Sequence, residues 1–240
     1  MMKLNKYGLS RDSLTEEDKR KIRRRCGFGC VICGSDLYEY HHFDPPFEEA
    51  KFHNPDGMTL LCCNHHGATT RGRLSLGSIK DANESPKCLQ EGFSHGLLDL
   101  DAPIVFLGTV TVHANHIILE VKHEPILWIE SPEVPDAPCR LSAIFHDKKG
   151  KEIARIDKNE WCAATGNWDV EIVGKKVIIR QKRGKYSLIM RLEPPGVIWI
   201  DRMNMCYKGY PISLGKDGAL RAGTNIIKGV TCSGENGLSL

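Results

Sequence analysis

The spacing of apolar residues changes once along the chain, and the change divides it into two parts with different expected structures. From Cys30 to about Gly72 the sequence is dense in Cys, His and Asp and has little continuous hydrophobicity, so this segment is expected to need a metal ion to fold. Beyond Gly96, short β-rich runs alternate with turn residues. We predict an α+β protein with a small N-terminal domain over residues 1–95. A mostly β C-terminal domain, a sandwich or a barrel-like roll, follows over residues 96–240.

Helix signals lie on both sides of the metal-rich segment. Ser13 and Glu16 fit a capping box and Thr15 offers a second cap, so a helix is expected from near Ser13 to Arg25. A second, short helix is expected over residues 75–82, followed by a polar connector.

The second part reads as strands joined by tight turns. Residues 147–150 and 182–185 have the composition of hairpin turns, and the last dozen or so residues, rich in Gly and Ser, are expected to form a loose tail. The expected strands cover residues 104–112, 116–121, 141–145, 177–180, 186–192 and 197–200.

Composition narrows the class of protein. Apolar residues make up 41% and charged residues 26% of the chain, as in soluble globular proteins. No apolar run approaches the roughly 18–20 residues that span a bilayer, and residues 1–25 lack the apolar stretch of a signal peptide. We therefore expect a cytoplasmic protein that does not contact a membrane.

The net charge of +3 is unevenly distributed. Residues 1–25 carry nine basic and four acidic side chains, whereas residues 26–100 carry five basic and ten acidic ones. This pattern indicates an anionic partner near the basic arm and cations near the acidic block. In a reducing cytosol, the clustered cysteines and histidines are expected to bind metal rather than to form disulfides.

Two short pairs of residues have the spacing of a zinc site: Cys30 with Cys33, and Cys62 with His65. Two intervening residues let a tight turn place both side chains on one tetrahedral ion, and thiolate with imidazole suits zinc. We predict that these four residues hold a structural zinc ion (Zn2+). The alternative is a set of buried free thiols that pack as small apolar groups. Cys26 and Cys63, which lie next to the pairs, are expected to be packed thiols.

The residues between and after the pairs carry a family resemblance. Residues 37–45 are expected to form a strand that ends in His41 and His42, and His66 is expected in a short helix that runs toward Arg71. Together with the Cys-x2-Cys pair and the Leu-Leu-Cys run before the second pair, this pattern resembles the HNH endonucleases of the ββα-metal class. The resemblance extends from about Ile22 to Arg73, and it implies a small zinc-stabilised ββα-metal domain.

The resemblance also implies a role for each histidine. His42 matches the general base that takes a proton from the attacking water, a task for which a neutral imidazole is suited. His41 and His66 match the ligands of a catalytic divalent cation such as Mg2+ or Mn2+. The family's middle Asn falls at Gly57 in this chain, and Asn54 is the nearest candidate to take its place. Asp44 is expected to form a turn, and His53 to be a solvated loop residue.

Nucleic acid is the expected partner, with DNA favoured over RNA. The basic run before the zinc segment and two arginines after His66 are candidates to contact phosphates, namely Arg23, Arg24, Arg25, Arg71 and Arg73. An HNH site makes one cut at a time, so cutting both strands would most simply need two copies, as in a homo-oligomer.

The sequence is therefore consistent with two functions from different classes. The first is a metal-dependent endonuclease that hydrolyses phosphodiester bonds. The second is a zinc-stabilised nucleic-acid-binding module whose β domain recruits a partner and whose histidines are catalytically idle, which the displaced Asn favours. The β domain shows no catalytic motif, so it could bind a regulator, bind DNA or assemble subunits.

Overall fold

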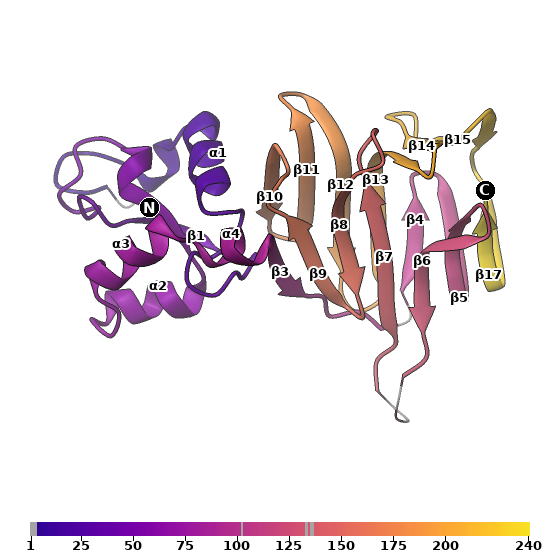
Figure 1. The fold of residues 1–240 in the computed structure, drawn as a ribbon, viewed down its shortest axis with the longest axis horizontal. Helices are drawn as coiled ribbons and strands as arrows, with labels where there is room; N and C mark the ends of the chain where they lie inside the picture. The colour runs from indigo at the N-terminus through magenta and orange to yellow at the C-terminus, as the bar shows by residue number, and fades with distance from the viewer. Residues whose placement is uncertain (1–3, 102, 133, 135–136) are drawn as a thin grey trace. The chain divides into compact units, whose positions relative to one another are not determined.

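The fold was analysed in a computed structural model that describes residues 4–101, 103–132, 134 and 137–240. The chain divides into two compact units, Met1–His95 and Gly96–Leu240 (Figure 1). The structure is of mixed α and β type with β predominating. None of the helices formed by the described residues has the length and the apolar character that crossing a membrane requires.

The first unit combines short helices with a two-stranded hairpin. Its strands β1 and β2 pair antiparallel, so that His41 lies opposite Thr59 and His42 opposite Met58. All of β2 is buried because α1 and α2 both contact it. The elements are η1 (Arg11–Ser13), α1 (Glu16–Arg25), β1 (Glu39–His42), η2 (Pro55–Gly57), β2 (Met58–Leu61), α2 (Cys63–Thr70), α3 (Leu76–Glu84) and α4 (Lys87–Glu91).

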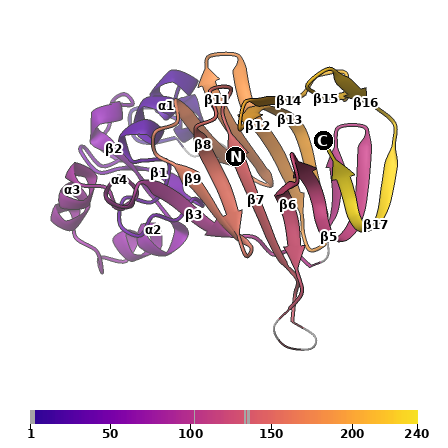
Figure 2. The same ribbon diagram turned by 45° about the vertical axis from the view of Figure 1, so that its right-hand side comes forward.

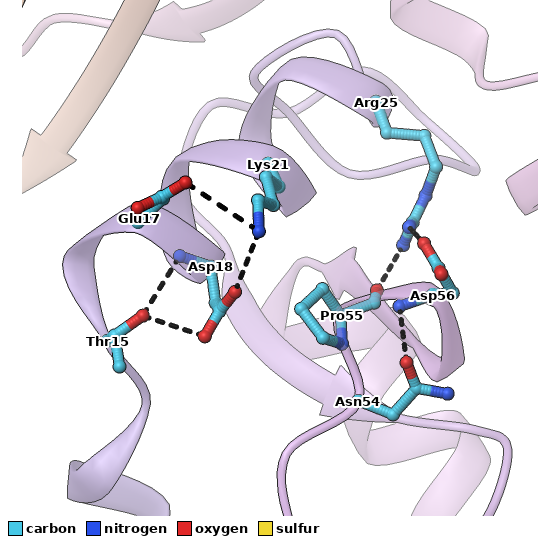
Figure 3. A network of polar contacts seen from close by, with 8 residues as sticks. All are labelled: Thr15, Glu17, Asp18, Lys21, Arg25, Asn54, Pro55 and Asp56. Carbon is cyan, nitrogen blue, oxygen red and sulfur yellow. Dashed lines mark hydrogen bonds and ion pairs between the residues drawn. The ribbon is translucent and has the colours of Figure 1, made fainter.

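Thr15 sets the start of α1. Its hydroxyl accepts a hydrogen bond from the Asp18 N–H at 3.2 Å and donates one to the Asp18 carboxylate at 2.7 Å, as Figure 3 shows. Ser13 instead ends η1, so the capping box predicted on Ser13 is wrong and the second predicted cap, Thr15, is confirmed. Acidic residues fill the first turn of α1 and arginines the last, which suits the helix dipole.

The core of the first unit is small and surrounds the cysteines. Ile22 from α1, Leu60 and Leu61 from β2, and Ile79 from α3 are fully buried. The cluster also contains Cys30 and Cys62. Because so few apolar side chains hold the unit together, a metal ion on these cysteines would add to a limited hydrophobic contribution.

In the second unit, strands follow one another through tight turns. Their order in the sheet is β10-β11-β12-β13-β4-β5-β6-β7-β8-β9, with β14 to β16 extending from β13 and β17 pairing with β5. The strands of this unit are β4 (Ile104–Leu107), β5 (Val110–Val121), β6 (Glu124–Glu130), β7 (Arg140–His146), β8 (Glu152–Asp157), β9 (Glu160–Ala164), β10 (Asp169–Val173), β11 (Lys176–Lys182), β12 (Lys185–Glu193), β13 (Val197–Tyr207), β14 (Tyr210–Leu214), β15 (Leu220–Ala222), β16 (Asn225–Ile227) and β17 (Thr231–Ser239). A further strand, β3 (Phe93–Leu97), contains the boundary between the units.

The described strands of the second unit form one hydrogen-bonded sheet that folds back on itself (Figure 2). β13 contacts β7, and the Tyr207 and His146 rings lie 5.4 Å apart, centroid to centroid. The Cys206 N–H donates to the Asp147 carbonyl at 2.9 Å. The mostly β character predicted for this unit is therefore confirmed, with its described strands in one continuous sheet.

Two further predictions for this unit need correction. The run predicted as one strand over residues 104–112 is two strands, because Gly108 turns the chain with a φ of +62°. The predicted loose tail is strand β17, which pairs parallel with β5. The two predicted hairpins are confirmed, since residues 147–150 lie between β7 and β8 and residues 182–185 include the turn between β11 and β12.

Candidate metal centre and histidine site

The four predicted zinc ligands lie together in the first unit. The ligand atoms of Cys30, Cys33, Cys62 and His65 are all within 4.8 Å of one another. The Cys33 and Cys62 sulfurs are 3.8 Å apart, and His65 Nδ1 lies 3.4 Å from the Cys30 sulfur and 3.2 Å from the Cys62 sulfur. Zinc–sulfur bonds of about 2.3 Å in a tetrahedron place two sulfurs about 3.8 Å apart. The donor set and its spacing therefore fit a zinc ion.

Local backbone structure brings each pair of ligands to the site. The first pair lies in a turn in which the Gly34 N–H donates to the Cys30 carbonyl at 2.8 Å. The second pair begins at Cys62, which is the N-cap residue of α2, and His65 lies one helical turn further. Burial raises the pKa of the Cys33 thiol to about 12, and the neighbouring sulfurs of Cys30 and Cys62 add to the rise. A cation is what would stabilise these sulfurs as thiolates.

His42 ends β1 as a buried side chain with 6% of its surface exposed. Its Nε2 lies 3.0 Å from Nδ1 of His53, while its Nδ1 is buried and makes no hydrogen bond with any described residue. Burial is the main reason that the pKa of His42 falls to about 4, and the neighbouring His53 and Arg11 side chains lower it further. Burial thus favours the neutral imidazole of His42, and one of its ring nitrogens has no hydrogen-bond partner among the described residues.

His41 and His66 form a second pair of imidazoles. Their ring centroids are 5.1 Å apart and their planes cross at 83°. The His41 Nε2 is buried and has no hydrogen-bond partner among the described residues. Burial lowers the pKa of His41 to about 4, and His66 contributes to the shift. The predicted convergence of these two side chains is therefore present in the structure.

A carboxylate lies next to this pair. Glu39 is two residues before His41 on β1, and its Oε2 is 3.4 Å from Nδ1 of His66. A carboxylate beside one ring nitrogen orients an imidazole for metal binding through the other. Among the described residues, however, only the Cys30–His65 group brings three or more ligand atoms together, so the second site consists of two imidazoles.

Position 57, where the HNH resemblance predicts an Asn, holds a glycine that has no room for a side chain. A Cβ atom on Gly57 would lie 1.7 Å from the Asp44 carbonyl oxygen, so no side chain fits there. The Gly57 carbonyl accepts hydrogen bonds from the N–H groups of Phe43 at 2.9 Å and Asp44 at 3.1 Å, the two residues after His42. The Asn54 side chain instead accepts from the Asp56 N–H at 3.2 Å, as Figure 3 shows. We correct the expectation for Asn54: the Gly57 carbonyl braces the loop that follows His42.

Two residues that the sequence analysis did not assign to the site lie beside His42. His53, expected to be solvated, is half-buried and hydrogen-bonded to His42. Arg11 is exposed, and its guanidinium lies 4.2 Å from the centroid of the Phe47 ring, which in turn lies 5.2 Å from the His42 ring. Neither residue belongs to a motif with fixed spacing, so only the structure could place them.

The candidate phosphate contacts differ in how accessible they are. Arg23 is 2% exposed and donates to the Tyr40 hydroxyl at 2.9 Å, so its assignment as a DNA contact is wrong. Arg25 is half-buried and donates to the Pro55 carbonyl at 2.9 Å (Figure 3). The remaining three candidates are exposed, namely Arg24, Arg71 and Arg73.

Replacing Arg23 and Arg24 by alanine should separate folding from binding. We expect Arg23→Ala to lower the free energy of unfolding by about 2 kcal/mol, because it removes a buried side chain and leaves the Tyr40 hydroxyl without this donor. Arg24→Ala should leave the melting temperature unchanged. If Arg24 contacts a phosphate, the variant should also reduce the slope of log DNA affinity against log salt concentration by about one. Thermal melting and DNA titrations at several salt concentrations measure both effects. Equal loss of stability in the two variants would contradict this assignment.

Cys26, Cys63 and Asp44 were predicted not to bind metal, and their burial and contacts can be compared with that prediction. Cys26 is fully buried and its sulfur lies 3.5 Å from the Thr59 hydroxyl, as expected of a packed thiol. Cys63 is exposed, so its prediction as a packed thiol is wrong. Asp44 lies after β1 and pairs with Lys80 at 2.9 Å, which is consistent with a turn residue and not with a metal ligand.

Comparison with known proteins gives no further support for any function. No protein-family model matches the chain, and neither the curated proteins nor the solved structures that were searched contain a match. The chemistry of the site itself is therefore the basis for assigning a function.

Proposed function

We propose that the protein is a metal-dependent endonuclease that hydrolyses phosphodiester bonds, with DNA as the favoured substrate and RNA as the second. One observation carries the proposal: a buried neutral His42, with Nδ1 unpartnered among the described residues, directly follows His41, whose ring meets that of His66. A proton acceptor next to a pair of metal-binding imidazoles is the combination that phosphodiester hydrolysis needs. The zinc-type cluster in the same unit supports the rigidity of the site.

In this mechanism His42 acts as the general base. Its Nδ1, which is buried in this structure, would take a proton from the attacking water once binding of substrate and cation admits that water, while the hydrogen bond at Nε2 keeps the ring oriented. His41 and His66 would hold a divalent cation, Mg2+, Mn2+ or a transition metal, and such a cation would supply stabilisation of negative charge on the phosphate and on the leaving oxygen. The partnerless buried Nε2 of His41 fits such a ligand role.

Positive side chains near the histidines would hold the phosphate backbone. Arg11 lies over the Phe47 ring, which in turn lies beside His42, so Arg11 is a candidate to bind a phosphate near the base. Arg71 and Arg73 follow α2, the helix that carries His66. Contacts of this kind bind nucleic acid with little dependence on sequence. Cutting both strands would take two copies, for example in a homo-oligomer.

A second function has its own support. The protein would be a zinc-stabilised nucleic-acid-binding module with idle histidines. Gly57 occupies the place of the family's middle Asn, and His41 with His66 offer only two ligands for a second cation. In that case the arginines would bind nucleic acid and the β unit would recruit a partner.

A plasmid-cleavage assay tests the proposal. Zinc-loaded protein is mixed with supercoiled DNA and either magnesium, manganese, nickel or added zinc. We expect nicked product with at least one metal, and a loss of about 10²- to 10⁴-fold for His42→Ala, the usual contribution of a general base. His123→Ala is the matched control, because its side chain in the second unit is 97% exposed. His66→Ala should raise the metal concentration needed for cleavage.

The outcomes separate the two functions. If wild-type protein binds DNA but fails to cut it with any of the metals tested, the binding-module function is supported. Equal cleavage by wild type and His42→Ala would assign the activity to a contaminant or to another site. Linear product formed without prior nicking would indicate that two copies act together.

A further inference from the structure

A chain of hydrogen bonds links His42 to the N-terminal turn η1. His42 Nε2 lies 3.0 Å from His53 Nδ1, and His53 Nε2 lies 2.9 Å from the Ser10 carbonyl oxygen. Ser10 is the N-cap residue of η1, 43 residues before His53 in the sequence. Each bond in this chain has a direction, because a carbonyl oxygen can only accept.

The proton on His53 is fixed by its two partners. The Ser10 carbonyl requires a donor, so His53 Nε2 must carry hydrogen. The Ser13 hydroxyl lies 3.0 Å from the same nitrogen, and it donates its own proton to the Ser10 carbonyl at 2.7 Å. Its oxygen therefore also faces His53 as an acceptor. Both partners favour the same tautomer, with hydrogen on Nε2 and a lone pair on Nδ1.

This tautomer of His53 determines that of His42. An acceptor at His53 Nδ1 requires a donor at His42 Nε2, because two lone pairs 3.0 Å apart would repel. A neutral imidazole carries one N–H, so the other nitrogen, His42 Nδ1, must hold the lone pair. This is the nitrogen that makes no hydrogen bond among the described residues.

We propose that His53 is a positioning residue that fixes His42 in the Nε2–H tautomer, so that the buried Nδ1 holds the lone pair that accepts the proton from water when substrate is bound. This inference rests on the proposed nuclease function and deepens it. Without His53, the ring could take the other tautomer, which would present an N–H to the water and no acceptor. A base in the wrong tautomer loses most of its catalytic contribution.

The surrounding contacts support a fixed orientation rather than a chance approach. Phe47 is buried and its ring lies 5.2 Å from the His42 ring. The His53 ring lies at 39° to that of His42 with centroids 5.1 Å apart. The bonds of Gly57 to Phe43 and Asp44 hold the backbone just after His42. His42 is thus contacted at its ring nitrogen by His53 and at its ring by Phe47, and the backbone that follows it is hydrogen-bonded to Gly57.

Nuclear magnetic resonance of the ring nitrogens tests the proposal directly, without activity. Full-length, zinc-loaded protein labelled with ¹⁵N-histidine is measured near pH 7.5 without any added second cation. Among the ten histidines, the His42 signals are identified by their loss in His42→Ala. We expect wild-type His42 to be protonated on Nε2 alone, and His53→Phe to show a mixture of both tautomers. His53→Gln should keep the wild-type pattern, because its amide oxygen can accept and its NH2 can donate.

Cleavage rates of the same variants complete the test. We expect His53→Phe to cut about 10- to 100-fold more slowly than wild type with an unchanged metal requirement, and His53→Gln to recover most of the rate. If His53→Phe fails to hold zinc, Ser13→Ala replaces it, with a smaller expected shift in tautomer because one of the two acceptors remains.

The results distinguish the two proposals. If wild-type His42 is a mixture of tautomers, or if His53 is doubly protonated at this pH, the positioning role is wrong even when the protein cuts DNA. If the His42 ring proton is found on Nε2 alone but no metal supports cleavage, His53 does fix the tautomer of His42 and the nuclease function is wrong. Unchanged cleavage by a folded His53→Phe variant would also overturn the positioning role.

Discussion

Replacing Cys30 and Cys33 together by serine will abolish zinc binding and unfold the first unit. The two sulfurs supply half of the cluster of four ligands, and Cys30 also belongs to the small core around Leu60 and Ile79. Structural zinc sites contribute about 10–16 kcal/mol of apparent binding free energy, which is comparable to the stability of about 5–15 kcal/mol of a typical domain. A unit with so small a core is not expected to stay folded after that loss.

The second unit provides an internal reference for this prediction. Its sheet has its own core and no part in the metal cluster, so its thermal transition should persist in the double variant. Metal analysis and calorimetry measure the two effects together: zinc per chain should fall from one to none, and only the transition of residues 1–95 should disappear. Cys63→Ser is the matched control, because Cys63 is next to Cys62 in the sequence but exposed. Retained zinc and an unchanged first transition in the double variant would show that the cluster binds no metal.

The zinc ligands could be predicted because the information lies in local spacing. Two residues between ligands define a turn whatever the rest of the chain does, and both pairs do meet. The role of His53 has no such local signal. Its partners are His42, 11 residues earlier, and Ser10, 43 residues earlier, and neither distance belongs to a repeating pattern. Contacts between loops of this kind depend on tertiary structure.

Arg23 shows a different limit of the sequence. Seven basic and apolar residues in a row on a helix cannot be assigned to a buried or an exposed face by composition alone, and neighbouring positions point in different directions. The structure buries Arg23 against Tyr40 and exposes Arg24. Charge density therefore identified a basic helix but not which of its side chains are exposed.

The sequence did not predict strand β17, and the glycines of this strand explain why. Gly and Ser are depleted in strands, so its composition predicted a loose tail. A Cβ atom on Gly237 would lie 2.4 Å from Cγ1 of Val112 and 2.7 Å from the Ile118 carbonyl oxygen. Glycine is thus the residue that lets this strand approach β5 closely. In this segment, glycine indicates close packing of backbone rather than freedom of the chain.

Placing at position 57 the Asn that the HNH resemblance predicts, by Gly57→Asn, will damage the protein rather than improve it. The new Cβ atom would lie 1.7 Å from the Asp44 carbonyl oxygen, so the loop of Phe43 and Asp44 must move away. That movement breaks the hydrogen bonds from both N–H groups to the Gly57 carbonyl. We expect the first unit to lose about 3 kcal/mol or more, as for severe overpacking. Its melting temperature should then fall by about 12 °C or more.

Activity should fall further than stability explains, because His42 directly precedes the displaced residues. Cleavage measured well below the melting temperature isolates this effect: the folded variant should cut more slowly than wild type at every metal concentration. Gly77→Asn is the matched control, since the nearest atom to its Cβ position is the Ser75 hydroxyl at 3.7 Å. If Gly57→Asn instead melted like wild type and cut faster, the side-chain amide would be the better brace. The Gly57 carbonyl would then have no role in holding the base, and the close contact with Asp44 would not constrain position 57.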